Sequence, residues 1–240
     1  MRAVADTVVV VAGGPIPGEH AAASVAPGAL VIAADSGADH ALALGLPIDV
    51  AIGDFDSITA TTLARLEQTN VRLERHPAAK DATDLELALD AALAFQPRRI
   101  VVLGGGAGRL DHLLGELLLL GADRYAGVEL DAHLGSATIH VIRGERLLVG
   151  TPNELISLLA LHGPATGILT EGLAYPLDGE TLAPGSSRGI SNLFTGTEAR
   201  VKVRHGALLA IRPGEPSGAA SGPTGGESRQ ARLTTAPAEW

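Results

Sequence analysis

Four short apolar runs, rich in Val, Ile, Leu and Ala, recur through the first half of the chain at residues 7–12, 29–34, 50–52 and 100–103. Continuous apolar runs of this length are typical of strands buried on both faces. Helical patterns separate these runs, and the clearest of them spans residues 83–95. Strands that alternate with helices through short loops indicate a parallel sheet with helices on its faces. We therefore predict an α/β fold over residues 1–126, with a Rossmann-like parallel sheet and helices on both faces.

The second half of the chain has a different pattern. Short apolar runs alternate with Gly and Pro turns at 138–142, 146–149, 155–160, 167–170, 198–203 and 207–211. This spacing is typical of an antiparallel sandwich or barrel, and we predict an all-β sandwich domain over residues 127–213. Residues 214–240 are rich in Gly, Pro, Ser, Ala and Thr and lack an apolar period, so we expect a disordered tail.

The composition excludes several classes of function. The formal net charge of −9 argues against non-specific binding of nucleic acid or of an anionic membrane. The chain has no Cys, which excludes disulfides, thiol catalysis and zinc–thiolate sites. No signal-like N-terminus and no apolar run of about 18 residues is present, so we expect a cytoplasmic protein with no membrane contact. The P-loop and Gly-x-Ser-x-Gly motifs are also missing.

Two carboxylates, Asp54 and Asp56, lie in a tight turn directly after the apolar run at 50–52. Acids spaced one residue apart repel each other unless a cation lies between them. Carboxylate oxygens are also the ligands that Mg²⁺ prefers, with phosphates and waters completing its shell. The alternative is that the segment 53–57 is only a polar turn that caps the next helix. The pair alone does not decide between these interpretations.

Polar residues follow the other predicted strands in the same way. They are Asp35 after the run at 29–34, Lys80, Asp81 and Asp84 after a short predicted strand at 71–74, and Arg109 and Asp111 after the run at 100–103. The carboxyl ends of parallel strands lie at one edge of a sheet, where ligands of open α/β folds bind. Six acids that converge at this edge are costly unless cations and hydrogen-bond donors compensate them. The sequence therefore predicts a cation and phosphate site there.

Simpler structural roles remain open for some of these residues. Asp35 and Ser36 would also serve as a helix cap. Thr83 and Glu86 form a capping-box pattern, so Thr83 has a structural interpretation even if Asp84 is a ligand. His112, a lone helical His, is more often a structural hydrogen-bonding residue than a catalytic one.

Arg109 is harder to explain structurally, because a cation in the first turn opposes the helix dipole. A bound anion such as phosphate would account for it, and the glycines at 104–108 would let backbone amides approach that anion.

Five short blocks of the sequence resemble the thiamine pyrophosphokinase (thiamine diphosphokinase) family. They are Ala-Asp-Ser-Gly-Ala at 34–38, Gly-Asp-Phe-Asp-Ser at 53–57, Lys-Asp-Ala-Thr-Asp at 80–84, Gly-Arg-Leu-Asp-His at 108–112 and Gly-Ile-Ser-Asn at 189–192. Each block is short, but five of them in order and spacing cover about residues 30–213. The resemblance implies a homodimeric enzyme that transfers the pyrophosphoryl group of ATP to the hydroxyl of thiamine and requires Mg²⁺.

The resemblance also implies roles for individual residues. The metal-binding acids would be Asp54, Asp56 and Asp84, and the acids that position the substrates would be Asp35 and Asp111. The ATP contacts would be Lys80, Asp81, Thr83, Arg109 and His112. The thiamine contacts would be Ser191 and Asn192, from the partner subunit. Catalysis is expected to rest on Asp35, Asp54, Asp56, Asp84, Arg109 and Asp111.

Two departures from the family pattern concern the substrates. Asp35 is followed by Ser-Gly where the family commonly has Gly-Gly. Some members stack thiamine on a Trp near the last strands, whereas this chain has no aromatic residue over 196–213 and only Phe194 lies close.

Two alternative functions remain. Pyrophosphoryl transfer to another alcohol, such as a hydroxymethyl pterin, would keep every acid. A non-catalytic nucleotide-binding or thiamine diphosphate-binding protein would have lost some ligands, and all family-matching acids are present here.

Overall fold

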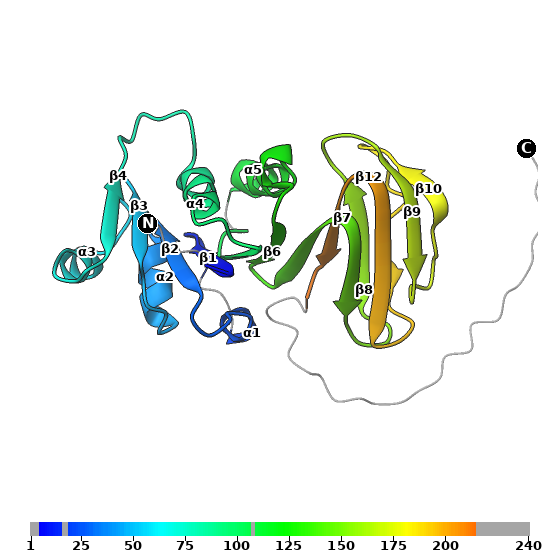
Figure 1. Ribbon diagram of the computed structural model, residues 1–240, viewed down its shortest axis with the longest axis horizontal. Coiled ribbons are helices and arrows are strands. Elements are labelled where there is room, and N and C mark those ends of the chain that lie inside the picture. The colour runs from blue at the N-terminus through cyan, green and yellow to red at the C-terminus, as the bar shows by residue number, and fades with distance from the viewer. Residues whose placement is uncertain (1–4, 16–18, 107–108, 215–240) are drawn as a thin grey trace, which may run out of the picture.

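The computed structural model describes residues 5–15, 19–106 and 109–214. Its architecture is mixed α/β: one large sheet of parallel and antiparallel strands, helices over the first half of the chain, and a β-rich C-terminal part (Figure 1). The predicted tail lies outside the described residues apart from Gly214. No helix of the described part is both long and apolar enough to span a bilayer.

The first half contains the predicted alternation of strands and helices. The strands are β1 (Thr7–Val11), β2 (Leu30–Ala34), β3 (Val50–Gly53), β4 (Arg72–Arg75), β5 (Arg99–Leu103) and β6 (Glu129–Leu134). The helices are α1 (Glu19–Ala23), α2 (Gly37–Ala43), α3 (Ala60–Glu67), α4 (Asp84–Leu93), α5 (Leu110–Leu120) and the short 3₁₀ turn η1 (Asp123–Tyr125). All six strands pair in parallel, in the order β4-β3-β2-β1-β5-β6. The chain therefore changes direction across the sheet at β1, and such a switch point opens a crevice at the carboxyl ends of the strands.

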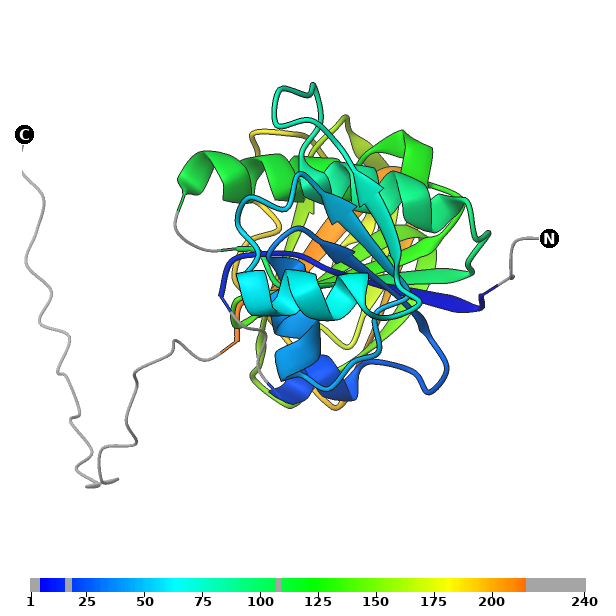
Figure 2. The same cartoon turned by 90° about the vertical axis from the view of Figure 1, so that its left-hand side faces the viewer.

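Alternate residues of the parallel strands supply two hydrophobic cores. Val8 and Val10 point to the face covered by α4 and α5, and share a core with Leu89 and Leu120 of these helices. Val9 and Val11 point to the opposite face, which carries α1, α2 and α3. Figures 1 and 2 show these two helix layers on either side of the sheet. Burial on both faces explains why the strands are continuous apolar runs and do not alternate.

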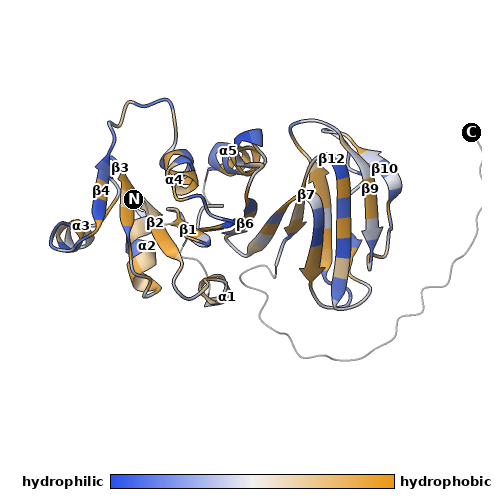
Figure 3. Cartoon of the chain, viewed as in Figure 1, coloured by the Kyte–Doolittle hydropathy of each residue, from blue (hydrophilic) through white to orange (hydrophobic). Residues whose placement is uncertain are grey.

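The C-terminal part is built around one long strand. Its strands are β7 (Ala137–Val149), β8 (Leu155–Ala160), β9 (Ala165–Glu171), β10 (Asp178–Leu182), β11 (Asn192–Leu193) and β12 (Glu198–Arg212). Strand β12 pairs with β7 along its length, with β9 over its first half and with β8 over its second half. A separate apolar core that includes Phe194 and Val201 fills this part. The alternating hydropathy of β12 is visible in Figure 3.

Three features of the second half differ from the sequence-based expectation. The segments 138–142 and 146–149 form one strand, β7, and the segments 198–203 and 207–211 form one strand, β12. Gly144 and Gly206 indicate turns locally, but both adopt positive φ within the strands, next to a shift in register between β7 and β12. Strand β6 was not predicted. It lies after residue 126, where the predicted first domain ends, but it pairs with β5 and so extends the parallel sheet.

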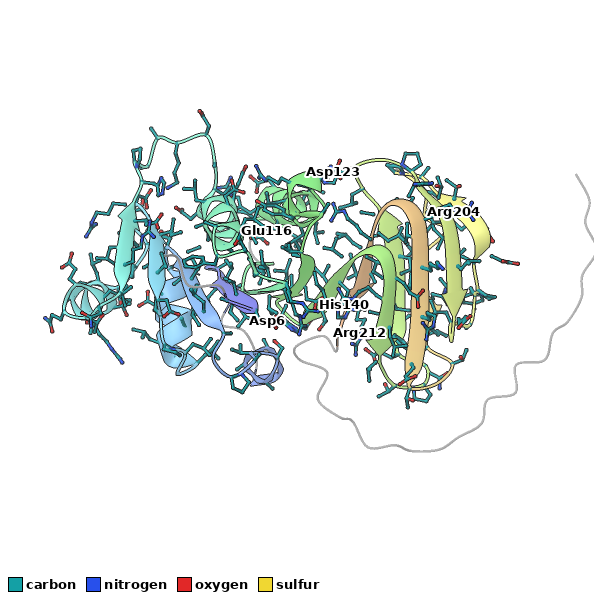
Figure 4. All side chains as sticks on the ribbon, viewed as in Figure 1. Asp6, Glu116, Asp123, His140, Arg204 and Arg212 are labelled. Carbon is teal, nitrogen blue, oxygen red and sulfur yellow. The ribbon has the colours of Figure 1, made fainter. Side chains whose placement is uncertain are left out.

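A buried ion cluster lies where the parallel and antiparallel strands meet. Asp131 of β6 is 1% exposed, and its carboxylate accepts hydrogen bonds from Arg99 at 2.6 Å and from Arg146 at 3.0 Å. The ring of His140, opposite Asp131 on β7, lies 2.8 Å from the same carboxylate (Figure 4). These contacts join β5, β6 and β7, and therefore couple the two parts of the chain.

Candidate functional site

A cavity of about 820 Å³ opens at the carboxyl edge of the parallel sheet. Two glycine turns line it, Gly13-Gly14 after β1 and Gly105 after β5, together with Asp35 after β2. The first residues of α4 and a face of α5 with both polar and apolar side chains also line it, together with Ala122, Arg124 and His162. This is the switch point at β1, so the cavity lies where the topology predicts a ligand site.

Three carboxylates gather at this edge. One oxygen from each of Asp35, Asp54 and Asp84 lies within 4.8 Å of the other two. Asp35 ends β2, Asp54 ends β3, and Asp84 begins α4, so three successive βα connections deliver them. The sequence-based prediction that these acids converge is therefore correct for Asp35, Asp54 and Asp84.

Lys80 supplies positive charge to this group. Its Nζ lies 2.9 Å from Asp84 Oδ1 and 3.4 Å from Asp54 Oδ2. Burial lowers the pKa of Lys80, but its bonds to Asp84 and Asp54 outweigh burial and raise the pKa overall. Lys80 is therefore held as a cation beside the acids.

Unusual backbone conformations position the acids. Asp35 has φ 46° and Phe55, between Asp54 and Asp56, has φ 62°. Phe55 is buried, with the guanidinium of Arg75 4.9 Å from the ring centroid, and this anchoring holds the turn. Non-glycine residues at positive φ cost energy and persist only where the surroundings impose them, as they often do at functional sites.

Gly53 makes room for the acid group. Its φ is 152°, and a Cβ at this position would lie 3.1 Å from the Cβ of Asp35 and 3.2 Å from Asp84 Oδ1. Glycine at the end of β3 therefore lets the two carboxylates approach the backbone closely.

The acids of the group differ in electrostatic environment. Burial raises the pKa of Asp35, and hydrogen bonds from the Ser36 amide and the Ser57 side chain offset this rise only in part, while the charges of Asp84 and Asp54 add to it. The backbone amide of Asp56 and the ammonium of Lys80 lower the pKa of Asp54. Asp35 Oδ1 is buried and has no hydrogen-bond partner among the described residues. A buried carboxylate oxygen without a donor is costly, and a bound cation would satisfy it.

Asp56 lies outside this group. Its side chain is exposed, and its Oδ1 accepts a hydrogen bond from the Ser57 hydroxyl at 2.8 Å. The structure thus places Asp35, in addition to Asp54 and Asp84, where the sequence analysis placed Asp56.

Thr83 and Asp81 belong to the loop before α4. Thr83 caps α4, because its hydroxyl accepts a hydrogen bond from the Glu86 amide at 3.2 Å. The Glu86 carboxylate bonds Arg124 instead of completing a capping box. Asp81 is exposed and does not line the cavity. Ser36 occupies the cap position of α2, but its side chain makes no capping hydrogen bond.

Arg109, Asp111 and His112 lie at the start of α5, on the cavity wall. Arg109 is exposed and forms a two-bond ion pair with Asp111, at 2.6 and 3.2 Å. This pairing lowers the pKa of Asp111 to about 2. His112 is exposed. The glycines before Arg109 are described only through Gly106, so residues 107–108 of the predicted phosphate loop lie outside the described residues.

Ser191 and Asn192 are remote from these acids and do not line the cavity. The Asn192 side chain is buried and bonds both the amide and the carbonyl of Tyr175, at 2.9 and 2.8 Å. Ser191 has φ 59°, and its amide donates to the Ser157 hydroxyl. One subunit therefore does not bring the two predicted substrate regions together.

The sequence analysis missed Glu116 as a site residue. This half-buried acid of α5 lines the cavity and accepts a hydrogen bond from the Gly106 amide at 2.9 Å. Its position one helical turn after His112 was the available signal, because residues i and i+4 share a helix face.

The acid group fits a divalent cation. Asp35, Asp54 and Asp84 each place one carboxylate oxygen within 4.8 Å of the other two, and Asp35 Oδ1 is buried without a donor. Such carboxylates form a hard oxygen donor set of the kind that Mg²⁺ binds.

Comparison with known proteins finds matches over both parts of the chain. Residues 24–129 match the family model described as thiamin pyrophosphokinase, catalytic domain, and residues 136–208 match thiamin pyrophosphokinase, vitamin B1 binding domain. Thiamine pyrophosphokinase of Bacillus subtilis (strain 168) is 34% identical over 189 residues, which are 76% of this chain and 86% of that protein.

Solved structures of the same kind share the fold. The crystal structure of thiamine pyrophosphokinase from Bacillus subtilis has a TM-score of 0.77 and 30% identity, and covers 87% of this chain and 99% of that chain. The corresponding structure from Geobacillus thermodenitrificans has a TM-score of 0.74 and 26% identity, and covers 88% and 99%.

The fold and the matched catalytic domain define an enzyme of the transferase class. More particularly, the chain belongs to the thiamine pyrophosphokinase family.

Proposed function

We propose that this chain transfers the pyrophosphoryl group of ATP to the hydroxyl of thiamine, giving thiamine diphosphate and AMP. The observation that carries the proposal is the group of Asp35, Asp54 and Asp84, bonded by Lys80, beside a cavity large enough for a nucleotide. Phosphoryl transfer demands little covalent chemistry from a protein, so positioning and charge neutralisation supply most of the rate.

Mg²⁺ is the proposed cofactor. Asp54 and Asp84 would hold it, together with Asp35, whose buried Oδ1 lacks a donor. Asp56 is exposed in the adjacent turn and stays a predicted ligand that lies outside this group. When bound, the ion would supply positive charge that neutralises the phosphates and stabilises the charge developing on the leaving AMP.

The residues of the chain supply the remaining steps. Lys80 partly neutralises the acids before the nucleotide arrives, and Thr83 and His112, which line the cavity, would contact its phosphates. Asp81 is exposed and outside the cavity lining, so its contact with ATP stays a prediction. Asp111 orients Arg109, whose guanidinium neutralises a non-bridging phosphate oxygen. Asp35 and Asp111 are the two candidate acceptors for the alcohol proton; Asp111 is exposed and paired with Arg109.

The thiamine half of the site is proposed to be shared between two subunits. Ser191 and Asn192 lie outside the cavity of their own chain, so a homodimer would bring Ser191 of the partner subunit to the acid group. Exposed apolar side chains support such a contact, including Leu110 at 79% and Leu114 at 54% exposure on one face of α5.

The finer description of the architecture and location is also a proposal. We propose that the first domain is Rossmann-like, which the strand order and the helices on both faces support. We propose that the second domain is sandwich-like, which is supported by the pairing of β12 with β9 over its first half and with β8 over its second half. The limits at 126/127 and 213/214, and a cytoplasmic location, stay predictions.

AMP release from ATP tests the proposal. We expect release with thiamine and MgCl₂, and none without either. Release with a hydroxymethyl pterin but not with thiamine would indicate the alternative acceptor. Binding of ATP with no AMP release for any alcohol would indicate the non-catalytic alternative.

A further inference from the structure

The glycine turn after β5 accepts no side chain. Gly104, Gly105 and Gly106 have φ values of 94°, 79° and 77°, which L-residues with a side chain rarely adopt. A Cβ on Gly105 would lie 2.9 Å from Glu116 Oε2, and one on Gly106 would lie 2.7 Å from the Cβ of Leu134. Gly105 lines the cavity, so the turn brings backbone without side chains to the cavity wall, the kind of surface that binds phosphate in many proteins.

The three amides of this turn have different acceptors. The Gly104 amide donates to the carbonyl oxygen of His133 at 3.0 Å, and the Gly105 amide donates to the carbonyl oxygen of Gly13 at 2.6 Å. Both of these acceptors are backbone atoms of the sheet and its loops. The Gly106 amide donates instead to the side-chain carboxylate of Glu116, at 2.9 Å. Gly106 is thus the one amide of the three whose acceptor can move away without disturbing the sheet.

The Glu116 carboxylate is held in a less polar place than a surface acid. Burial raises its pKa, while the Gly106 amide and the nearby His112 lower it only in part. Figure 4 shows Glu116 where α4 and α5 face the sheet, and its carboxylate lies on the wall of the cavity. A negative charge on this wall repels an anionic ligand that enters the cavity.

We propose that Glu116 is a positioning residue that acts as an internal anion: it holds the glycine turn through Gly106 and competes with a phosphate of the nucleotide for that amide. This inference rests on the proposed function, because the competing ligand is ATP. In the free enzyme the carboxylate keeps the amide satisfied and the turn ordered. When ATP binds, its phosphate displaces the carboxylate, and the cost of that displacement weakens nucleotide binding.

Glu116→Gln separates the charge from the hydrogen bond. The Gln carbonyl oxygen can still accept from the Gly106 amide, but it carries no charge. We expect the KM for ATP to fall about three- to tenfold, with no comparable rise in kcat, because a repulsive interaction in the bound state is removed. Calorimetric titration with ATP and MgCl₂ in the absence of thiamine should show the same fold decrease in Kd.

Two further variants provide the controls. Asp6→Asn removes one negative charge at the opposite edge of the sheet, just before β1, and should leave the KM for ATP unchanged. Glu116→Ala removes both the charge and the hydrogen bond, so its thermal midpoint should fall below that of Glu116→Gln.

An unchanged or weakened affinity for ATP in Glu116→Gln overturns the inference, and Glu116 is then only a structural residue. An equal decrease in KM or Kd in Asp6→Asn also overturns it, since net charge alone would explain the effect. Failure of the proposed function is distinguishable: if no alcohol is pyrophosphorylated, the calorimetric comparison with ATP still decides the role of Glu116. An unmodified enzyme that does not bind ATP overturns both.

Discussion

The ammonium of Lys80 lies 2.9 Å from Asp84 Oδ1 and 3.4 Å from Asp54 Oδ2. One lysine thus bridges two acids that come from different strand ends, 30 residues apart in sequence. The first contact is a local i, i+4 pair, and the second exists only because β3 and the loop before α4 meet at the same sheet edge.

Replacing Lys80 should expose the repulsion within the acid group. We expect Lys80→Gln to lower kcat about 100-fold, because a preorganised charge at the phosphate site is lost. MgCl₂ should raise the thermal midpoint of this variant more than that of the unmodified chain, because a divalent ion would replace the missing cation. Lys202→Gln, an exposed lysine on β12, is the matched control and should change neither quantity. Full activity in Lys80→Gln would contradict the site.

The acids of the metal site can be tested one at a time. We expect Asp84→Asn to lower kcat about 10²- to 10³-fold, because it removes a charge from the centre of the acid group. Asp56→Asn should also abolish turnover while leaving the unfolding midpoint unchanged, because its exposed side chain bonds only Ser57. Steady-state kinetics across a series of MgCl₂ concentrations measures both effects. Unimpaired activity in Asp56→Asn would remove the predicted metal role of Asp56.

Gly53→Ala tests the close approach of the acids to the backbone. The new Cβ would press on Asp35 and Asp84, and the backbone strain at φ 152° costs about 1–3 kcal/mol. We expect lower activity together with a lower free energy of unfolding. Gly28→Ala is the control, because Gly28 also has a positive φ, 77°, but a Cβ there meets no atom within 4 Å. Gly28→Ala should therefore lower the free energy of unfolding without lowering activity. An equal loss of activity in both variants would argue against a role of Gly53 in the site.

Asp131 should govern stability at acid pH. Burial raises its pKa, but bonds from His140 and Arg99 and the charge of Arg146 outweigh burial and lower the pKa below its ordinary value. A carboxyl whose pKa is lower in the folded than in the unfolded chain contributes its full stability above the unfolded value of about 4, and loses it as pH falls further. Asp131→Asn leaves its cationic partners unpaired and should cost about 3–5 kcal/mol at pH 7.

Urea unfolding between pH 7 and pH 3 measures this effect. The unmodified chain should lose stability steeply below about pH 4, and the difference from Asp131→Asn should shrink in that window. Asp178→Asn, an exposed acid at the start of β10, should run parallel to the unmodified chain. A constant difference at every pH would contradict the role of the Asp131 charge.

The proposed shared site predicts an effect of Ser191 on thiamine alone. We expect Ser191→Ala to raise the KM for thiamine about tenfold and to leave the KM for ATP unchanged, because it removes one polar contact to that substrate. Sedimentation velocity should show a dimer at assay concentration. A monomer that retains full activity would exclude a site shared between subunits.

Local sequence patterns determined much of this fold. The apolar runs at 7–12, 29–34, 50–52 and 100–103 became β1, β2, β3 and β5, because strands covered on both faces need uninterrupted apolar side chains. The acids after those strands were predicted to meet because a parallel sheet brings its carboxyl ends to one edge. The capping role that was kept open for Thr83 is also local, and the structure shows it.

Tertiary structure decided what depends on partners distant in sequence. Glycines at 144 and 206 indicate turns locally, yet pairing between β7 and β12 draws both into long strands. Asp35, and not Asp56, joins Asp54 and Asp84 in the acid group. This choice depends on the positive φ of Asp35 and Phe55 and on the burial of Phe55, which are set by the folded chain. The Glu116–Gly106 and Asp131–Arg99 contacts likewise join separate elements, and such contacts leave no periodic trace in the sequence.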